Sequence, residues 1–262
     1  MEALYFMVSF IASVAGAICG IGGGVIIKPV LDCFHIASVS TISFLSSCTV
    51  LSMSFYSVGR SFIARDSKVD AAIGTPLAVG AASGGLLGKY LFGCMKALSH
   101  NAETVGAAQS ICLAIITLGT LIYTIYKDRI PTMRLNNKTA CVVIGLFLGV
   151  MSSFLGIGGG PINLVVLFFF FSMDTKTAAQ NSLYIILVSQ IFSIIFTLMT
   201  HTVPDFDPLS LTVMVFGGIA GGVLGRILNK RINNKTVNNL FLALMGIIIF
   251  ISGYNIYRFL TI

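Results

Sequence analysis

The sequence predicts an all-α polytopic membrane protein with two inverted repeats, each a glycine-broken helical hairpin followed by three transmembrane helices. Three observations predict this fold class: the composition, the length of the apolar runs and a duplicated glycine motif. Of the 262 residues, 56% are hydrophobic and 10% are charged, whereas soluble domains carry about 25% charged residues. Several apolar runs reach the roughly 18 residues that a transmembrane helix needs. The lipid bilayer is therefore the predicted environment of most of the chain.

The apolar runs divide the chain into two halves with the same plan. In the first half, a run at 3–34 is interrupted by glycines at 20–24, and continuous segments follow at 36–59, 71–93 and 104–126. In the second half, a run at 139–173 is interrupted by glycines at 156–160, and continuous segments follow at 177–200, 209–228 and 237–257. We therefore expect a first transmembrane repeat at 1–126, a cytoplasmic linker at 127–138 and a second, inverted repeat at 139–262.

Two duplicated motifs indicate that the halves are an internal repeat. Residues 20–24 and 156–160 both read Gly-Ile-Gly-Gly-Gly, an offset of 136 positions. The segments 80–89 and 217–226 both end in Gly-Gly-x-Leu-Gly and a basic residue, an offset of 137. Two matches at nearly one offset are specific evidence for a duplication. Glycines in the second motif recur every four residues, which predicts faces for close helix packing.

The distribution of Lys and Arg predicts how the chain crosses the membrane. If each broken run crossed once, basic loops would face both sides and the positive-inside bias would vanish. If each run is a hairpin that returns to its starting side, twelve of the sixteen Lys and Arg face the cytoplasm. The hairpins then orient the halves oppositely, as in many secondary transporters, and place both termini on the outer face of the membrane. Whether the second arm of each hairpin is re-entrant or a short tilted span stays open.

The glycine motifs are the first candidates for a binding site. Glycine costs a helix about 1 kcal/mol relative to alanine, and a break at membrane depth is tolerated only inside protein or along a wet cavity. A helix that starts after each break would point its N-terminal N–H groups inward, where they attract an anion. Pro161 suits the first position of such a helix. The candidate residues are Gly22, Gly23 and Gly24 in the first half and Gly158, Gly159 and Gly160 in the second. Close helix packing is the alternative role of these glycines.

Polar side chains near the breaks extend the candidate site. Lys28 lies one turn after the first break, and a cation at this depth either serves function or extends to the interface. Asn163 lies near the second break. The helices that follow the hairpins begin with further polar residues, namely Thr41 and Ser43 in the first half and Gln180, Asn181 and Ser182 in the second. Their hydroxyls and amides can bind substrate oxygens or join neighbouring helices.

Other classes of function find little support in the sequence. An intramembrane enzyme would need a nucleophile with a base, or a metal pair, and the chain has no HExxH, no GxSxG and no paired membrane aspartates. We therefore predict no catalytic residue, metal or cofactor, and we interpret the six cysteines as small buried hydrophobic residues. No basic cluster is large enough to follow nucleic-acid phosphates. An anion channel with a glycine-loop filter remains an alternative to a carrier.

At these residues the chain resembles the TauE/SafE family of membrane transporters, also called the sulfite exporter or toluene sulfonate uptake family. The shared features are the paired Gly-x-Gly-Gly-Gly segments, Pro29 after the first of them, a polar helix start after each, and the Gly-Gly-x-Leu-Gly-basic motifs that end at Lys89 and Arg226. The resemblance implies transport of sulfite, sulfoacetate, sulfonates or similar anions across the bacterial inner membrane. Pro161 and Lys28 depart from the family's pattern, and both bear on the particular substrate.

The resulting hypothesis is a secondary transporter that works by alternating access around a midplane site between the two glycine breaks. Its partners would be a small anionic substrate, which is a sulfur oxyanion, a sulfonate or a carboxylate, and a coupling ion, H⁺ or Na⁺.

Overall fold

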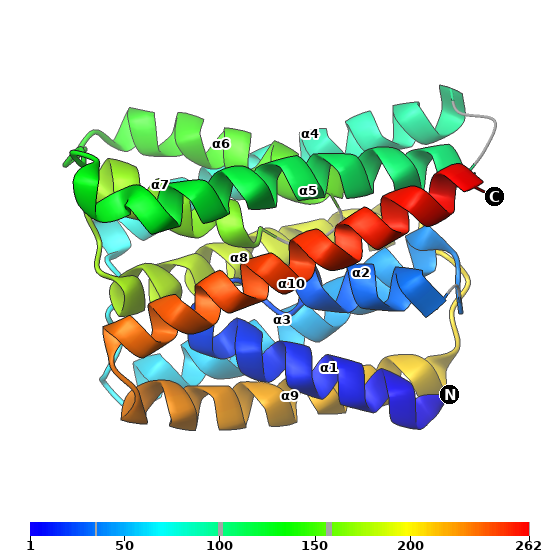
Figure 1. Ribbon diagram of the computed structural model, residues 1–262, viewed down its shortest axis with the longest axis horizontal. Coiled ribbons are helices and arrows are strands. Elements are labelled where there is room, and N and C mark those ends of the chain that lie inside the picture. The colour runs from blue at the N-terminus through cyan, green and yellow to red at the C-terminus, as the bar shows by residue number, and fades with distance from the viewer. Residues whose placement is uncertain (35, 99–101, 156–158, 262) are drawn as a thin grey trace.

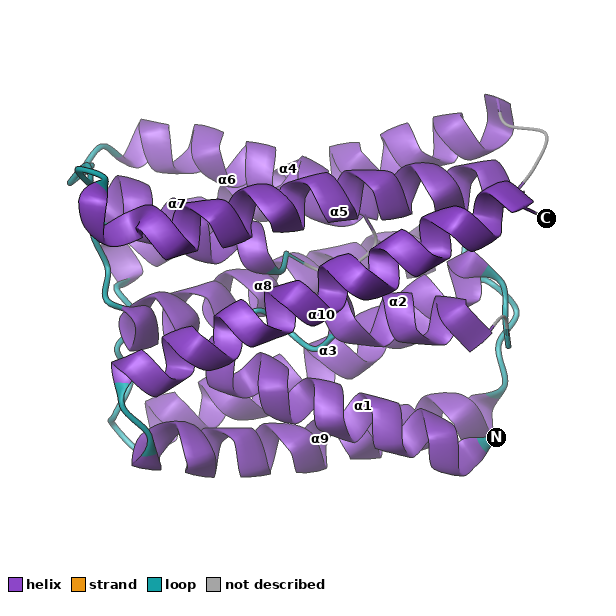
Figure 2. Cartoon of the chain, viewed as in Figure 1, coloured by secondary structure: helices purple, strands orange, loops and turns teal. Residues whose placement is uncertain are grey.

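Helices form every regular element in the part of the chain that the structure describes (Figure 2). The structure is a computed structural model that describes residues 1–34, 36–98, 102–155 and 159–261. The first half contains α1 (Glu2–Cys19), α2 (Gly24–Phe34), α3 (Val39–Ile63), α4 (Ala71–Leu98) and α5 (Ala102–Tyr126). After a short 3-10 turn, η1 (Lys127–Arg129), the second half contains α6 (Lys138–Leu155), α7 (Pro161–Phe171), α8 (Thr175–Met199), α9 (Pro208–Arg231) and α10 (Asn234–Thr261). The prediction of an all-α chain is confirmed.

Membrane-spanning length separates the helices into two groups. Within the described residues, eight helices are long and apolar enough to cross a membrane, which confirms the prediction of a multi-pass membrane protein. The other two, α2 and α7, have 11 residues each. At 1.5 Å per residue each extends about 17 Å, roughly half of the hydrocarbon core of a bilayer. Each short helix follows one of the two predicted breaks.

The two short helices form hairpins that open at opposite ends of the molecule (Figure 1). One end carries both chain termini and the loop at 200–207, and we call it the termini end. The opposite end carries the loops at 64–70 and 130–137, and we call it the basic end. The first hairpin, α1 and α2, opens toward the termini end, and the second, α6 and α7, opens toward the basic end. An inverted repeat requires such opposed hairpins, although the repeat itself stays a prediction.

Backbone geometry explains why glycine stands at the breaks. Helix α1 ends at Gly20, which adopts the left-handed conformation at φ 78° and donates its N–H to the carbonyl of Gly16 at 2.8 Å. A Cβ at Gly20 would collide with the backbone of Ala179 on α8. At the second break, Gly160 has φ 62° and ψ −144°, a region that is essentially restricted to glycine. Pro161 occupies the first turn of α7, where a missing N–H leaves no acceptor unpaired.

Both predicted glycine faces pack against a helix of the other half. Helix α4 packs along α6, and α9 packs along α1. The first face, formed by Gly80, Gly84 and Gly88, lies against the backbone of α6. The second face, formed by Gly217, Gly221 and Gly225, lies against the backbone of α1. A Cβ at Gly84 would collide with the carbonyl oxygen of Leu146, and one at Gly221 would lie 2.5 Å from that of Phe10. These carbonyls are 136 positions apart, so equivalent residues of the two halves build the two interfaces.

We expect the substitution Gly84→Ala to lower the apparent melting temperature of the detergent-solubilised protein. The added methyl group would collide with α6, and overpacking of this kind costs roughly 1–3 kcal/mol. Gly119→Ala on α5 is the matched control, because no atom lies within 4 Å of the position its Cβ would take. Equal melting temperatures for the two variants would contradict the close contact between α4 and α6.

Candidate functional site

A cavity of about 650 Å³, here called the main cavity, lies among the helices of both halves. It reaches from Gly159 at the second break to residues of the termini end, such as Ser40 and Thr202. Its walls come from α3, α4, α6 and α8, with Gln109 of α5 and with Asn163 of α7 beside the break. The volume falls within the range of small-molecule sites. The cavity therefore joins the beginning of α7 to one face of the molecule.

Several buried polar atoms line the main cavity without a hydrogen-bond partner among the described residues. They are Ser43 Oγ, Gln109 Oε1, Asn163 Oδ1 and Gln190 Oε1. The side chain of Asn163, in the first turn of α7, is only 1% exposed. Buried polar groups are almost always hydrogen-bonded in folded proteins, so unpaired groups along a cavity wall indicate a polar ligand or water. The first turn of α7 adds N–H groups that have no partner within the helix, and a partial positive charge, at the same place.

Lys89 on α4 gives the main cavity its positive charge. Among the described residues that line the cavity, it is the single charged side chain. Its Nζ donates to the carbonyl oxygen of Ser193 at 2.6 Å and to Thr197 Oγ1 at 2.5 Å, both on α8. Neither acceptor carries a formal charge, so the ammonium charge is not neutralised by these contacts. Sequence reasoning assigned Lys89 no role in the site, although the Gly-Gly-x-Leu-Gly motif that ends at this residue could have indicated it.

A second hollow of about 420 Å³ lies toward the basic end, and we call it the basic pocket. It is lined by residues of α1, α3, α8 and α9 and by the loop at 64–70. Four of its residues are cationic and one is acidic, namely Lys68, Lys176, Arg226, Lys230 and Asp66. The two hollows thus lie on opposite sides of the glycine breaks, and both contain basic side chains.

Ile186 on α8 lies between the two glycine breaks. A Cβ at Gly22 would lie 3.3 Å from Ile186 Cδ1, and one at Gly159 would lie 3.0 Å from Ile186 Cγ1. Val50 on α3, which is 136 positions earlier, is also close to Gly22, at 3.5 Å from the same Cβ position. Ile186 is 0% exposed and Val50 is 1% exposed. Along α3, Val50 lies between Ser47, which lines the main cavity, and Ser57, which lines the basic pocket, and we call these two apolar side chains and the first break the constriction.

The structure brings together only part of the predicted site. Ser43, Gly159 and Asn163 line the main cavity, Gly22 lies at the constriction, and Gln180 lines the basic pocket. The remaining candidates line neither hollow, and these are Gly23, Gly24, Lys28, Thr41, Gly160, Asn181 and Ser182. Gly158 lies outside the described residues. The first helix start, at Gly24, therefore does not face the main cavity as the second one does.

Lys28 lines neither of the two hollows described above, and its ammonium is buried in an ion pair. Its Nζ lies 3.0 Å from Asp32 Oδ2, one helical turn away, and the two side chains are 4% and 3% exposed. Breaking a buried pair by removing one partner costs about 3–5 kcal/mol, because it leaves an uncompensated charge. The i and i+4 spacing of Lys28 and Asp32 is visible in the sequence and could have indicated this ion pair.

The polar helix starts serve mainly to hold loops. Thr41 Oγ1 donates to the carbonyl of Asp205 at 3.0 Å, which fastens α3 to the loop at 200–207. Asn181 accepts from the N–H of Asp70 at 3.0 Å and donates to the carbonyl of Lys68 at 3.1 Å. These contacts join helices to loops, whereas the sequence analysis considered substrate binding and bonds between neighbouring helices. The hydroxyl of Ser182 is buried and has no partner among the described residues.

The comparison with protein-family models identifies the chain. Residues 5–252 match the model described as Sulfite exporter TauE/SafE, which is nearly the full length. The chain belongs to the TauE/SafE family. Because members of this family are transporters, the prediction of a transporter rather than an enzyme is confirmed. Neither the search of curated proteins nor that of solved structures returned a significant match for this TauE/SafE chain.

We expect Ile186→Ala to make the TauE/SafE protein leaky to small anions in proteoliposomes. The smaller side chain would no longer fill the space between the breaks, and the two hollows would connect. Ile185→Ala is the control, because Ile185 lines the main cavity and the same side-chain loss there leaves the constriction in place. Passive sulfite leak is the measurement, and equal leak rates for both variants would argue against a constriction at Ile186.

Proposed function

We propose that this TauE/SafE protein is a secondary transporter that moves a small anion, either a sulfur-containing oxyanion, a sulfonate or an organic acid, across the inner membrane. The observation that carries the proposal is the main cavity, where the N-terminus of α7, unpaired polar atoms and Lys89 surround one space. A helix N-terminus and an ammonium both favour negative charge. No carboxylate lines the cavity among the described residues, so the electrostatic preference is for anions.

The substrate-binding residues of this proposal combine predicted and newly found positions. Ser43 and Asn163 supply a hydroxyl and an amide, Gly159 lies beside the N–H groups of α7, and Lys89 supplies the cation. Sulfite, sulfonates and carboxylates share oxygens that accept hydrogen bonds from such groups. The cavity also has apolar walls, including Phe44 and Ile185, which suit an organic substituent as well as a simple oxyanion.

Alternating access is the mechanism we propose. The main cavity faces the termini end, and the constriction at Val50 and Ile186 closes it toward the basic end. Under the positive-inside rule, the basic end is cytoplasmic, both termini are outside, and this conformation is open to the outside. Movement of one half against the other would then close the main cavity and open the cytoplasmic side. A coupling ion, H⁺ or Na⁺, belongs to the same proposal.

Anion flux in proteoliposomes tests the proposed function directly. The purified protein would be screened by thermal shift against sulfite, thiosulfate, sulfonates and small carboxylates, because a ligand that binds only the folded state stabilises it. The anions that stabilise the protein would then be tested for saturable uptake and for exchange. Stabilisation by none of them, together with no flux, would refute the proposal, and conductance in a planar bilayer would favour a channel.

Lys89→Gln should weaken binding of the transported anion by roughly 10- to 100-fold. Losing a charged hydrogen bond costs about 1.5–3 kcal/mol, and 1.4 kcal/mol corresponds to about tenfold in affinity. Lys89→Arg should retain most of the affinity, and Lys138→Gln is the control for net charge, since Lys138 is exposed at the start of α6. Isothermal titration measures the dissociation constants. Unchanged affinity in Lys89→Gln would remove the ammonium from the site.

A further inference from the structure

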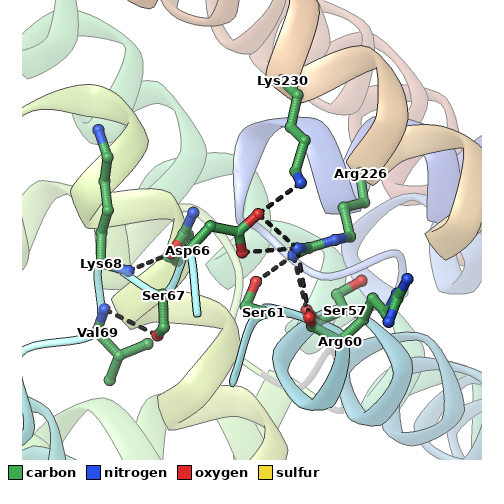
Figure 3. A network of polar contacts seen from close by, with 10 residues as sticks. Ser57, Arg60, Ser61, Asp66, Ser67, Lys68, Val69, Arg226 and Lys230 are labelled. Carbon is green, nitrogen blue, oxygen red and sulfur yellow. Dashed lines mark hydrogen bonds and ion pairs between the residues drawn. The ribbon is translucent and has the colours of Figure 1, made fainter. Parts of the chain in front are cut away.

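Asp66, in the loop between α3 and α4, is bound by two cations of α9 (Figure 3). Arg226 Nη2 donates to Asp66 Oδ1 at 2.7 Å and to Oδ2 at 2.9 Å. Lys230 Nζ lies 2.5 Å from Asp66 Oδ2. A planar guanidinium and an ammonium around one carboxylate form the arrangement that also recognises free oxyanions. The basic pocket therefore contains a formed anion-binding geometry, and a side chain of the protein occupies it.

Arg226 corresponds to Lys89 in the other half. Lys89 Nζ donates to the carbonyl of Ser193 and to Thr197 Oγ1, and Arg226 Nη1 donates to the carbonyl of Ser57 and to Ser61 Oγ. Ser57 and Ser61 precede Ser193 and Thr197 by 136 positions. Each cation is thus attached to the same two positions of the long helix in the opposite half. One of them lines the main cavity and the other lines the basic pocket.

The two equivalent cations differ in their charged neighbours. No carboxylate lines the main cavity around Lys89 in the described part of the chain, whereas Asp66 covers Arg226 in the basic pocket. The basic pocket still has an excess of positive charge, because Lys68, Lys176 and Lys230 accompany Arg226. One carboxylate cannot balance these cations, so the pocket remains attractive to a further anion.

The loop at 64–70, which carries Asp66 and joins α3 to α4, contacts both α8 and α9. At α8, the N–H of Lys68 donates to Gln180 Oε1 at 2.7 Å, and Asn181 holds the backbone of Lys68 and Asp70. At α9, the Asp66 carboxylate makes the contact. The side chain of Asp66 is 34% exposed, so water and solutes reach it. An exposed loop contact of this kind exchanges far more readily than a buried one.

We propose that Arg226 and Lys230 form a second anion-binding site, for the small oxyanion that the protein transports, and that Asp66 occupies this site as a tethered competitor in the present conformation. The proposal rests on the proposed function, because it treats the basic pocket as the counterpart of the main cavity. An oxyanion that reaches the pocket replaces the carboxylate, which releases the loop at 64–70 from α9. The substrate itself then opens the basic side.

Protonation does not release Asp66 at neutral pH. The hydrogen bond from Lys230, together with the bonds and charge of Arg226, lowers the pKa of Asp66 from its ordinary value of 3.8. A carboxylate with a lowered pKa keeps its ionic contacts above that pKa and loses them only as the pH falls through it. Exchange with another anion is therefore the route that opens the contact under physiological conditions.

Binding of sulfite to full-length protein in detergent tests the second site. The measurements use a Lys89→Gln background, which removes the cation of the main cavity. Adding Asp66→Asn should tighten sulfite binding by about tenfold or more, because an anion that enters the pocket no longer has to displace the charged hydrogen bonds of Asp66. Adding Arg226→Gln to that variant should abolish the gain. Asp128→Asn is the control, since it removes an exposed acidic charge at the same end and should leave the affinity unchanged.

The alternative outcomes are distinct. Unchanged or weaker sulfite binding in the Asp66→Asn variant would overturn the proposal, and Asp66→Ser replaces that variant if it is not monodisperse. A lipid phosphate has the same oxyanion chemistry, so the titration is repeated with dihexanoyl phosphatidylglycerol. A gain for the lipid without a gain for sulfite would assign the pocket to a headgroup and refute the proposal. If the wild-type protein transports sulfite but Asp66→Asn does not tighten sulfite binding, only the second site is refuted. If Asp66→Asn tightens binding but the wild-type protein shows no flux, only the transport function is refuted.

Discussion

The structure depends on how two breaks in helical hydrogen bonding are accommodated at membrane depth. Peptide groups freed by a break have no water to bind there, so other parts of the protein must surround them. Helix α8 provides the surroundings for both breaks, because Ala179 lies against Gly20 and Ile186 lies against Gly22 and Gly159. Glycine allows this approach because a Cβ at Gly20 would collide with α8. One helix therefore carries the constriction, lines both hollows and holds the loop at 64–70.

The cations around this centre differ in whether an acidic side chain accompanies them. Lys28 and Asp32 neutralise each other inside α2, which lets a short helix retain ionic groups where lipid lies near. Lys89 is placed along a wall without an acid, and Arg226 is placed beside one. Of the two equivalent cations, Arg226 is thus bound by a carboxylate of the protein, whereas Lys89 is not bound by one among the described residues. A transporter that exposes one side at a time needs an asymmetry of this kind in any single conformation.

The sequence predicted the features that local composition controls. Apolar runs and basic loops define the membrane spans, and glycine triplets mark where helices cannot continue, so α1, α2, α6 and α7 have bounds close to those expected. Contacts between distant segments were not predictable in this way. The roles of Lys89 and Ile186 follow from what α4 and α8 meet in the fold, and the exchange of contacts between Asn181 and the loop at 64–70 spans more than a hundred positions. By contrast, the spacing of Lys28 and Asp32 within one helix is visible in the sequence, and the two side chains form a buried ion pair.

The crossed packing of the glycine faces has a consequence for how the protein is made. Helix α1 packs along α9, which is synthesised some 190 residues later. At about 5–20 residues per second, the first helix waits in the bilayer for roughly 10 to 40 seconds with its partner absent. The face of α1 that α9 covers in the folded protein lacks this partner throughout that interval. The interface between α1 and α9 is therefore completed late, after α9 has been inserted.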